Sequence, residues 1–262
     1  NYIRQSRVFL YSMHKNMVLT LTLFWFSYYA AMSGTSLYES WVYTGYNFIL
    51  GLPIVAYGIL DRDLTDKFMQ RYPQTYSTGR DNAYLNITSI GSWIGNAVIY
   101  AVLLSLLCFV AMDATFQSWS LYSFGTAVYT ALCMSLQAKV SFLYHQWQYC
   151  NIFTMFISVA GMLFFFYVLN EMPTDYINDY DNEANFAYSK LVFWVMCFVT
   201  IPVMVVMVDF IVHAYWLMFD PTAEMLYREA ESQVSGCFVL VADWFADTYF
   251  VLFSLHSVLF CL

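Results

Sequence analysis

The apolar residues of this chain fall into six long blocks separated by shorter polar segments. The blocks cover approximately residues 8–32, 42–60, 92–112, 121–143, 149–169 and 191–218. Each is close to the roughly 20 residues that a helix needs to cross a hydrocarbon core. None shows the alternation of a half-buried strand, and backbone groups in lipid must be satisfied within a helix or a closed barrel. The pattern predicts an all-α fold, a polytopic membrane bundle of about six transmembrane helices.

Composition and cysteine usage agree with a membrane protein. The chain has 61% hydrophobic and 11% charged residues, whereas a soluble domain carries roughly a quarter charged residues. Its six cysteines lie in or near the apolar blocks without the paired spacing of a metal or disulfide site. We therefore predict no metal site. The net charge of −8 is divided among the loops and predicts no nucleic-acid partner.

Positive charge lies on one side of the predicted bundle. Lys and Arg occur in the N-terminal segment, in the long loop and after the sixth block, whereas loops 33–41, 113–120 and 170–189 contain acidic residues and neither Lys nor Arg. Basic residues stay on the cytoplasmic side of short loops. We expect an integral, multi-pass membrane protein with both ends of the six-helix domain in the cytoplasm. The pattern does not distinguish the plasma membrane from an endomembrane.

The chain divides into two regions. Residues 1–232 form the predicted transmembrane domain, which includes the cytoplasmic loop 61–91. Residues 233–262 are an unassigned apolar tail, because the apolar part, 248–262, is shorter than a membrane span. The tail is compatible with a truncated helix, an interfacial segment or foreign sequence. The chain starts without Met, and we interpret it as a fragment.

The first block contains a polar stripe around a lysine. Lys15 lies within the block, and Ser12, Asn16 and Thr20 recur every four residues and therefore share one helix face. An ionisable side chain within a span is costly and is by default a functional hypothesis. Lys15 is the leading candidate for a substrate-path residue. The alternative is that Lys15 extends to the cytoplasmic interface while the hydroxyls join helices.

Proline interrupts the second block. Pro53 removes one helical hydrogen bond and leaves a carbonyl without its usual partner, and Asn47 lies one and a half turns earlier. A free carbonyl can bind a polar group where it faces a cavity. Asn47 and Pro53 are therefore candidates for the same path, with a simple kink as the alternative.

Three polar residues in later blocks are secondary candidates. Gln137 and Lys139 lie in the fourth block, and Asp209 lies in the sixth, four residues before His213. Because they fall towards the predicted cytoplasmic ends, extension to the interface and structural pairing are the competing interpretations. The pair of Asp209 and His213 is too sparse for a metal site, which needs three or four ligands.

These features, taken in order, resemble one known family. The resemblance covers roughly residues 3–232 and rests on Leu10-Tyr11, Lys15-Asn16, Tyr46-Asn47, Leu52-Pro53, Gly58, Asp61, Asp63, Tyr72-Pro73, Gln137-Ala138-Lys139, Ile201-Pro202 and Asp209. The chain is similar to the C-terminal membrane domain of P4-type ATPases, the phospholipid flippases, from their fifth to their tenth transmembrane helix. It departs from the family pattern at Ser12, Met13 and His14, which replace aromatic residues, and at Leu50-Gly51.

The resemblance implies roles for the candidate residues. Lys15 and Asn16 would meet the lipid headgroup, and exposed backbone near Pro53 would line the opposite wall with Asn47. It further implies an ATP-driven phospholipid translocase that uses ATP and Mg²⁺ in the full-length protein, often with a glycosylated accessory β-subunit. The sequence contains no phosphorylation, nucleotide-binding or actuator motif. We expect this fragment to bind no cofactor and to be inactive alone.

Two other functional classes compete with the flippase interpretation. A secondary transporter or channel subunit would normally show paired internal repeats, and none is visible between the first three and last three blocks. A non-catalytic membrane scaffold would keep every activity of its assembly when Lys15 is replaced by alanine.

Overall fold

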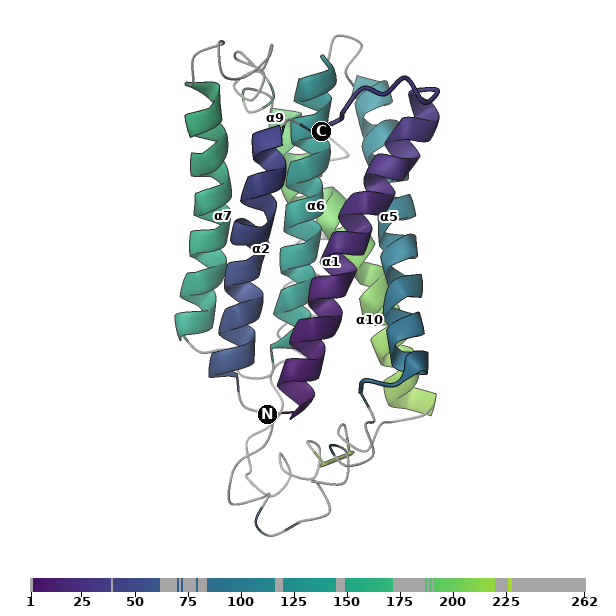
Figure 1. The fold of residues 1–262 in the computed structure, drawn as a ribbon, viewed down its shortest axis with the longest axis vertical. Helices are drawn as coiled ribbons and strands as arrows, with labels where there is room; N and C mark the ends of the chain where they lie inside the picture. Colours follow the sequence, from purple (N-terminus) through teal and green to yellow (C-terminus); the bar gives the residue numbers. More distant parts are fainter. Residues whose placement is uncertain are drawn as a thin grey trace, which may run out of the picture. The chain divides into compact units, whose positions relative to one another are not determined.

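The described part of the structure consists of helices and of short turns and irregular segments between them. The computed structural model describes residues 2–38, 40–61, 70, 72, 79, 84–115, 120–144, 149–171, 187, 189, 191–219 and 226–227, and among these it has no strand. The elements are α1 (Tyr2–Tyr29), α2 (Ser40–Leu60), α5 (Ile87–Thr115), α6 (Leu121–Leu143), α7 (Tyr149–Asn170), α9 (Leu191–Val195), the π-helix η2 (Met196–Thr200) and α10 (Ile201–Phe219) (Figure 1). The predicted all-α bundle is confirmed.

The chain forms two compact units. One contains residues 1–63 and 76–213, and the other contains residues 64–75 and 214–262. The candidate residues all belong to the first unit. The apolar tail 233–262 and all four basic residues of the loop 61–91 lie outside the described residues, so their predicted roles stay predictions.

Among the described residues, four helices have the length and hydropathy to cross a membrane, namely 40–60, 87–110, 149–170 and 193–219. The other two long helices, α1 and α6, carry more polar residues, and α6 shows why a bundle tolerates this. It packs against α2, α5 and η2, and Thr130, Ser135, Gln137 and Lys139 are all buried there. A helix surrounded by other helices can carry polar side chains because its neighbours supply their partners.

The end of α1 is set by local backbone geometry. The N–H of Met32 donates to the carbonyl of Ser27 and the N–H of Ala31 to that of Tyr28, which is the Schellman pattern that closes a helix. Ala31 and Met32 have φ of 51° and 56°, a left-handed conformation that favours glycine. Helix α1 therefore ends at Tyr29, whereas the hydrophobic block predicted its end at residue 32.

The predicted sixth span is one helical stretch with a wider turn inside it. Its π-helical turn, η2, ends directly before α10, where Ile201 donates its N–H to the carbonyl of Met196. Pro202 follows, and a proline ring clashes with the carbonyl one turn earlier in a regular α-helix. The π turn relieves this clash, because it changes which carbonyl lies below the ring.

Helix α2 continues through Pro53 because its neighbours replace the lost hydrogen bond. The carbonyl that Pro53 leaves without a helical donor belongs to Ile49, and it accepts a hydrogen bond from the hydroxyl of Ser158 on α7 at 2.5 Å. Ser158 in turn accepts from the side-chain amide of Gln137 on α6 at 2.7 Å. The proline thus marks the place where three helices are joined.

The N-terminal turns of α1 hold the C-terminal end of α2. The guanidinium of Arg4 donates to the backbone carbonyls of Ile59, at 3.4 Å, and Asp61. Carbonyls at a helix C-terminus have no donor within the helix and attract cations. Helices α1 and α2 pack against each other, and α1 starts at Tyr2 rather than at residue 8 because its polar first turns have this partner.

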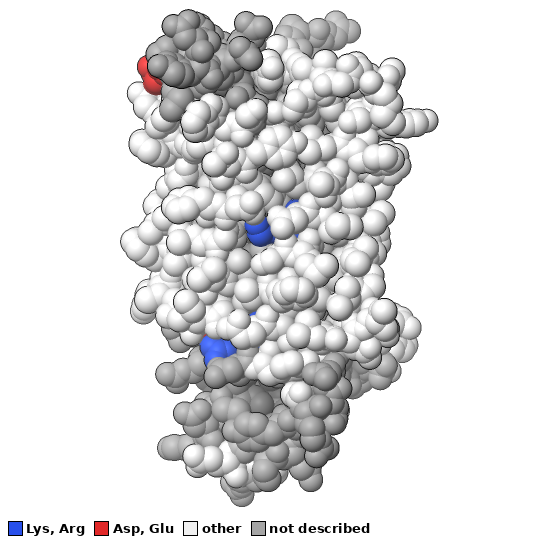
Figure 2. All heavy atoms as spheres, viewed as in Figure 1, with Lys and Arg blue, Asp and Glu red and all other residues white. Residues whose placement is uncertain are grey.

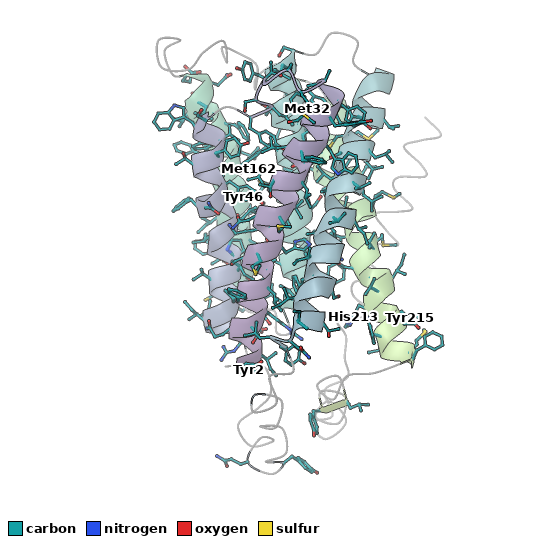
Figure 3. The ribbon with its side chains drawn as sticks, turned by 45° about the vertical axis from the view of Figure 1, so that its right-hand side comes forward. Tyr2, Met32, Tyr46, Met162, His213 and Tyr215 are labelled. Atoms are coloured by element: carbon teal, nitrogen blue, oxygen red, sulfur yellow. The ribbon has the colours of Figure 1, made fainter. Side chains whose placement is uncertain are left out.

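The outer surface of the helices is apolar. Phe48, Ile59, Phe156 and Phe164 are among many large side chains that are more than two-thirds exposed, whereas Tyr46 and Met162 lie inside (Figure 3). In Figure 2 the described surface is almost free of charged atoms, apart from a few lysine or arginine atoms in the middle and lower part and one acidic group at the upper edge. A surface of this kind is suited to lipid.

We predict opposite effects for two glycine substitutions. A Cβ at Gly125 of α6 would lie 2.2 Å from the backbone oxygen of Leu37, whereas one at Gly161 of α7 meets nothing within 4 Å. Gly125→Ala should lower the stability of the purified membrane protein by about 1–3 kcal/mol. Gly161→Ala should leave it unchanged or raise it by up to about 1 kcal/mol, because alanine favours helix. Thermal unfolding in detergent tests this, and equal effects of the two would contradict the close contact.

We also predict that Ser158→Ala weakens the bundle. The substitution removes the donor to Ile49 and leaves both that carbonyl and Gln137 without a partner, which should cost about 1–2 kcal/mol. Ser141→Ala is the matched control, because the Ser141 hydroxyl bonds only to a carbonyl of its own helix. A lower unfolding temperature for Ser158→Ala alone would support the bridge, and equal temperatures for both variants would count against it.

Candidate functional site

Lys15 faces the proline-containing helix. Its Nζ donates to Oδ1 of Asn47 at 2.5 Å and lies 5.1 Å from the centre of the Tyr46 ring, a cation–π distance. The hydroxyl of Tyr46 donates to the backbone carbonyl of Lys15 at 2.5 Å. Lys15 is 5% exposed, so it does not extend to an interface. The structure brings Lys15 and Asn47 into direct contact, whereas the resemblance placed Asn47 on the opposite wall of the path.

A polar strip of surface borders this contact. Asn16, Thr20 and Asn47 are exposed and Ser12 is half-buried. The Thr20 hydroxyl donates to the carbonyl of Asn16 at 2.7 Å within its own helix. Exposed amides in the middle of a membrane-spanning helix are costly when they face hydrocarbon. The polar strip is therefore suited to contact another protein segment or a polar ligand rather than hydrocarbon.

Pro53 does not share this surface. Its side chain is buried and its own carbonyl accepts from the hydroxyl of Tyr144 at 2.8 Å. The carbonyl that it frees, that of Ile49, is taken by Ser158. The expectation that exposed backbone near Pro53 lines a wall with Asn47 is wrong, because neighbouring helices satisfy that backbone from inside.

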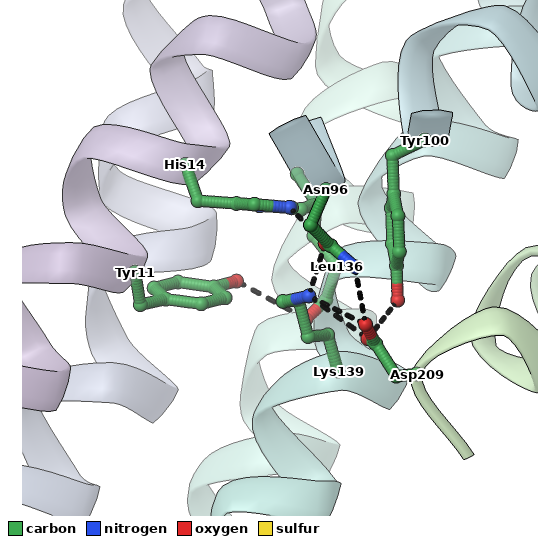
Figure 4. A network of polar contacts seen from close by, with 7 residues as sticks. All are labelled: Tyr11, His14, Asn96, Tyr100, Leu136, Lys139 and Asp209. Carbon is green, nitrogen blue, oxygen red and sulfur yellow. Dashed lines mark hydrogen bonds and ion pairs between the residues drawn. The ribbon is translucent and has the colours of Figure 1, made fainter. Parts of the chain in front are cut away.

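A second polar cluster joins α1, α5, α6 and α10 (Figure 4). At its centre Lys139 forms an ion pair with Asp209, with Nζ 2.9 Å from Oδ2, and the two side chains are 7% and 17% exposed. Tyr100 donates to the same carboxylate. The ammonium of Lys139 also lies 4.4 Å from the centre of the Tyr100 ring. A buried ion pair is stable only when its remaining polar atoms have partners, and this cluster supplies them.

Asn96 connects this cluster to α1. Its Oδ1 accepts from Nζ of Lys139 at 2.7 Å, and its Nδ2 donates to Oδ1 of Asp209 at 2.8 Å. Nε2 of His14 lies 2.8 Å from the same Asn96 oxygen. Because that oxygen can only accept, His14 must carry its proton on Nε2.

The sequence placed some of these residues correctly and missed others. The pairing of Lys139 with Asp209 joins different helices, whereas the sequence suggested a relation within α10 to His213. Of the two competing interpretations, the structure shows structural pairing, because the ammonium of Lys139 is bound inside the bundle and does not extend to the interface. Asn96 was missed, although an asparagine within an apolar block was a signal that could have identified it.

The two buried lysines differ in their counter-charge. Lys139 has the carboxylate of Asp209, whereas in the described part of the chain no carboxylate forms an ion pair with Lys15, whose hydrogen-bond acceptor is the neutral amide of Asn47. Among the described residues no group of three or more His, Cys, Asp or Glu could hold a metal ion. Because Lys15 has a positive charge and no counter-charge among the described residues, its side chain is suited to bind an anion.

The chain is similar to a group of lipid-transport proteins. Residues 1–222 match the family described as phospholipid-translocating P-type ATPase C-terminal. The chain is 29% identical to phospholipid-transporting ATPase C887.12 of Schizosaccharomyces pombe over 80% of its own length and 17% of that protein. It is 26% identical to phospholipid-transporting ATPase DRS2 of Saccharomyces cerevisiae over 88% of its own length and 18% of that protein.

The match covers helices α1 to α10 and both clusters. The chain spans less than a fifth of the length of these two relatives. Within that span the family match, the helical bundle and the apolar surface agree with one another. The chain belongs to the family of phospholipid-translocating P-type ATPases and corresponds to the C-terminal membrane domain of these proteins.

Proposed function

We propose that this chain is the membrane part of an ATP-driven phospholipid flippase and that Lys15 meets the lipid headgroup. The observation that carries this proposal is the lack of a counter-charge at Lys15 in the described structure, where its ammonium contacts the neutral amide of Asn47 and the ring of Tyr46. An unpaired cation in a weakly hydrated site attracts a phosphate more strongly than it would in water. The headgroup phosphate would supply the missing charge while the acyl chains stay in lipid.

The exposed strip gives the headgroup its polar surroundings. Asn16 and Thr20 from α1 and Asn47 from α2 present amide and hydroxyl groups beside the ammonium. Asn47 is exposed whereas Lys15 lies behind it. The headgroup would first meet the amides and then replace Asn47 as the partner of Lys15. Parts of the full-length protein that precede this domain would cover the other side of the path.

Energy for transport would come from outside this domain. We infer that ATP and Mg²⁺ act in cytoplasmic domains of the full-length protein, and that these are coupled to the helices described above. By the distribution of Lys and Arg, both ends of the six-helix domain would face the cytoplasm. A glycosylated accessory β-subunit on the opposite side is a further proposed partner.

We predict that Lys15→Met in the full-length protein abolishes most lipid stimulation. The substitution removes the charge that would attract the phosphate and keeps a side chain of similar length. Lipid-stimulated ATPase activity in reconstituted vesicles should fall at least about tenfold, the effect of losing roughly 1.4 kcal/mol of interaction. The unfolding temperature should not fall, because no counter-charge is left unpaired.

Lys15→Arg is the matched control for charge. It keeps the cation and should retain a larger fraction of the lipid response than Lys15→Met. If Lys15→Met were stimulated by lipid as strongly as the wild type, a role of Lys15 in the headgroup path would be excluded. ATP-independent lipid movement by the wild type would instead favour a secondary transporter or channel.

A further inference from the structure

His14 and Lys15 are adjacent on α1 but contact different helices. Successive residues of an α-helix point about 100° apart. Nε2 of His14 bonds to Asn96 of α5, whereas Nζ of Lys15 bonds to Asn47 of α2. Any rotation of α1 about its axis that moves Lys15 therefore also moves His14 away from Asn96.

We propose that Asn96 is a positioning residue for lipid transport, which holds α1 in the rotation that presents Lys15 to the headgroup. The inference rests on the proposed role of Lys15 and adds a residue from another helix to it. Asn96 is bound on one side by the Lys139–Asp209 ion pair and on the other by His14. The amide of Asn96 thus connects the Lys139–Asp209 ion pair to α1, the helix that carries Lys15.

The chemistry of the position favours asparagine. Its oxygen accepts from two donors, His14 and Lys139, and its nitrogen donates to Asp209. Aspartate would place a second negative charge beside Asp209, and leucine, of similar size, offers neither donor nor acceptor. A half-buried amide with partners on three helices holds its neighbours in one geometry, because each alternative leaves a polar atom without a partner.

Packing alone also holds His14, so the experiment must separate the two effects. The ring is 1% exposed and lies edge-on to Trp93 and Tyr100, with centroid distances of 5.8 and 5.1 Å. His14→Phe keeps an aromatic ring of similar shape and removes the hydrogen bond. His14→Gln keeps a donor in the place of Nε2 and removes the ring.

The experiment uses the full-length flippase in vesicles of phosphatidylcholine. The probe is whichever of phosphatidylserine and phosphatidylethanolamine stimulates the wild type more. For each variant we would measure the lipid fraction that gives half-maximal ATPase activity and the maximal rate. Asn96→Leu and His14→Phe should each raise the half-maximal lipid fraction about three- to fifteen-fold, the range expected for the one interhelical hydrogen bond to α1 that both variants remove. The maximal rate should change less than this fraction does.

Two further variants make the result specific. His14→Gln should lie closer to the wild type than His14→Phe does, because it restores the donor. The double variant of Asn96→Leu and His14→Phe should show no more than the larger single effect, since both remove the same bond. Tyr100→Phe is the control, because it removes a donor to Asp209 and leaves the bond between His14 and Asn96 in place.

Several outcomes would overturn the proposal. Wild-type lipid dependence of both Asn96→Leu and His14→Phe would do so, as would additive effects in the double variant. An equal shift for Tyr100→Phe would show that the cluster acts only through general stability. Lys15→Met is measured in parallel: if it shifts the lipid response and Asn96→Leu does not, only this inference fails. If Lys15→Met has no effect, the proposed function itself fails.

Discussion

The structure depends on one constraint, which is that a polar group inside hydrocarbon must find its partner within the protein. Four side-chain hydroxyls meet it by donating to backbone carbonyls of neighbouring helices. They are Tyr11 to Leu136, Tyr46 to Lys15, Tyr144 to Pro53 and Ser158 to Ile49. These bonds connect α6 with α1, α1 with α2, the end of α6 with α2, and α7 with α2. Hydroxyl groups thus provide specific links in a bundle where apolar burial alone cannot hold helices together.

Hydropathy predicted the helices because the membrane imposes their length. The block at 121–143 coincides with α6, and that at 149–169 differs from α7 by one residue. The start of α1 was misplaced, because Arg4 is polar and its partner is the end of another helix. The π turn before Pro202 also escaped prediction, since it depends on how the chain accommodates a proline within an apolar run.

The candidate site was only partly visible in the sequence. Lys15 and Asn47 belong to consecutive helices, and the sequence assigned both to one path but to opposite walls of it; their direct hydrogen bond depends on how α1 and α2 pack. The contact of Lys139 with Asp209 joins residues 70 apart in sequence, and nothing in helical periodicity relates them. Pro53 was recognised as freeing a carbonyl, but which side chain takes that carbonyl depends on the packing of α7 against α2.

The two buried lysines divide the bundle into a fixed part and an adaptable part. Lys139 has a counter-charge and additional partners, so moving its ammonium would leave the half-buried carboxylate of Asp209 without its counter-charge, at a cost of up to about 3–5 kcal/mol. Lys15 contacts only neutral groups, the amide of Asn47 and the ring of Tyr46, so exchanging Asn47 for an anion costs much less. Helix α1 touches both parts, through His14 on one side and Lys15 on the other. A transporter needs such a division, because a site that releases its ligand must change while the helices that shape it keep their places.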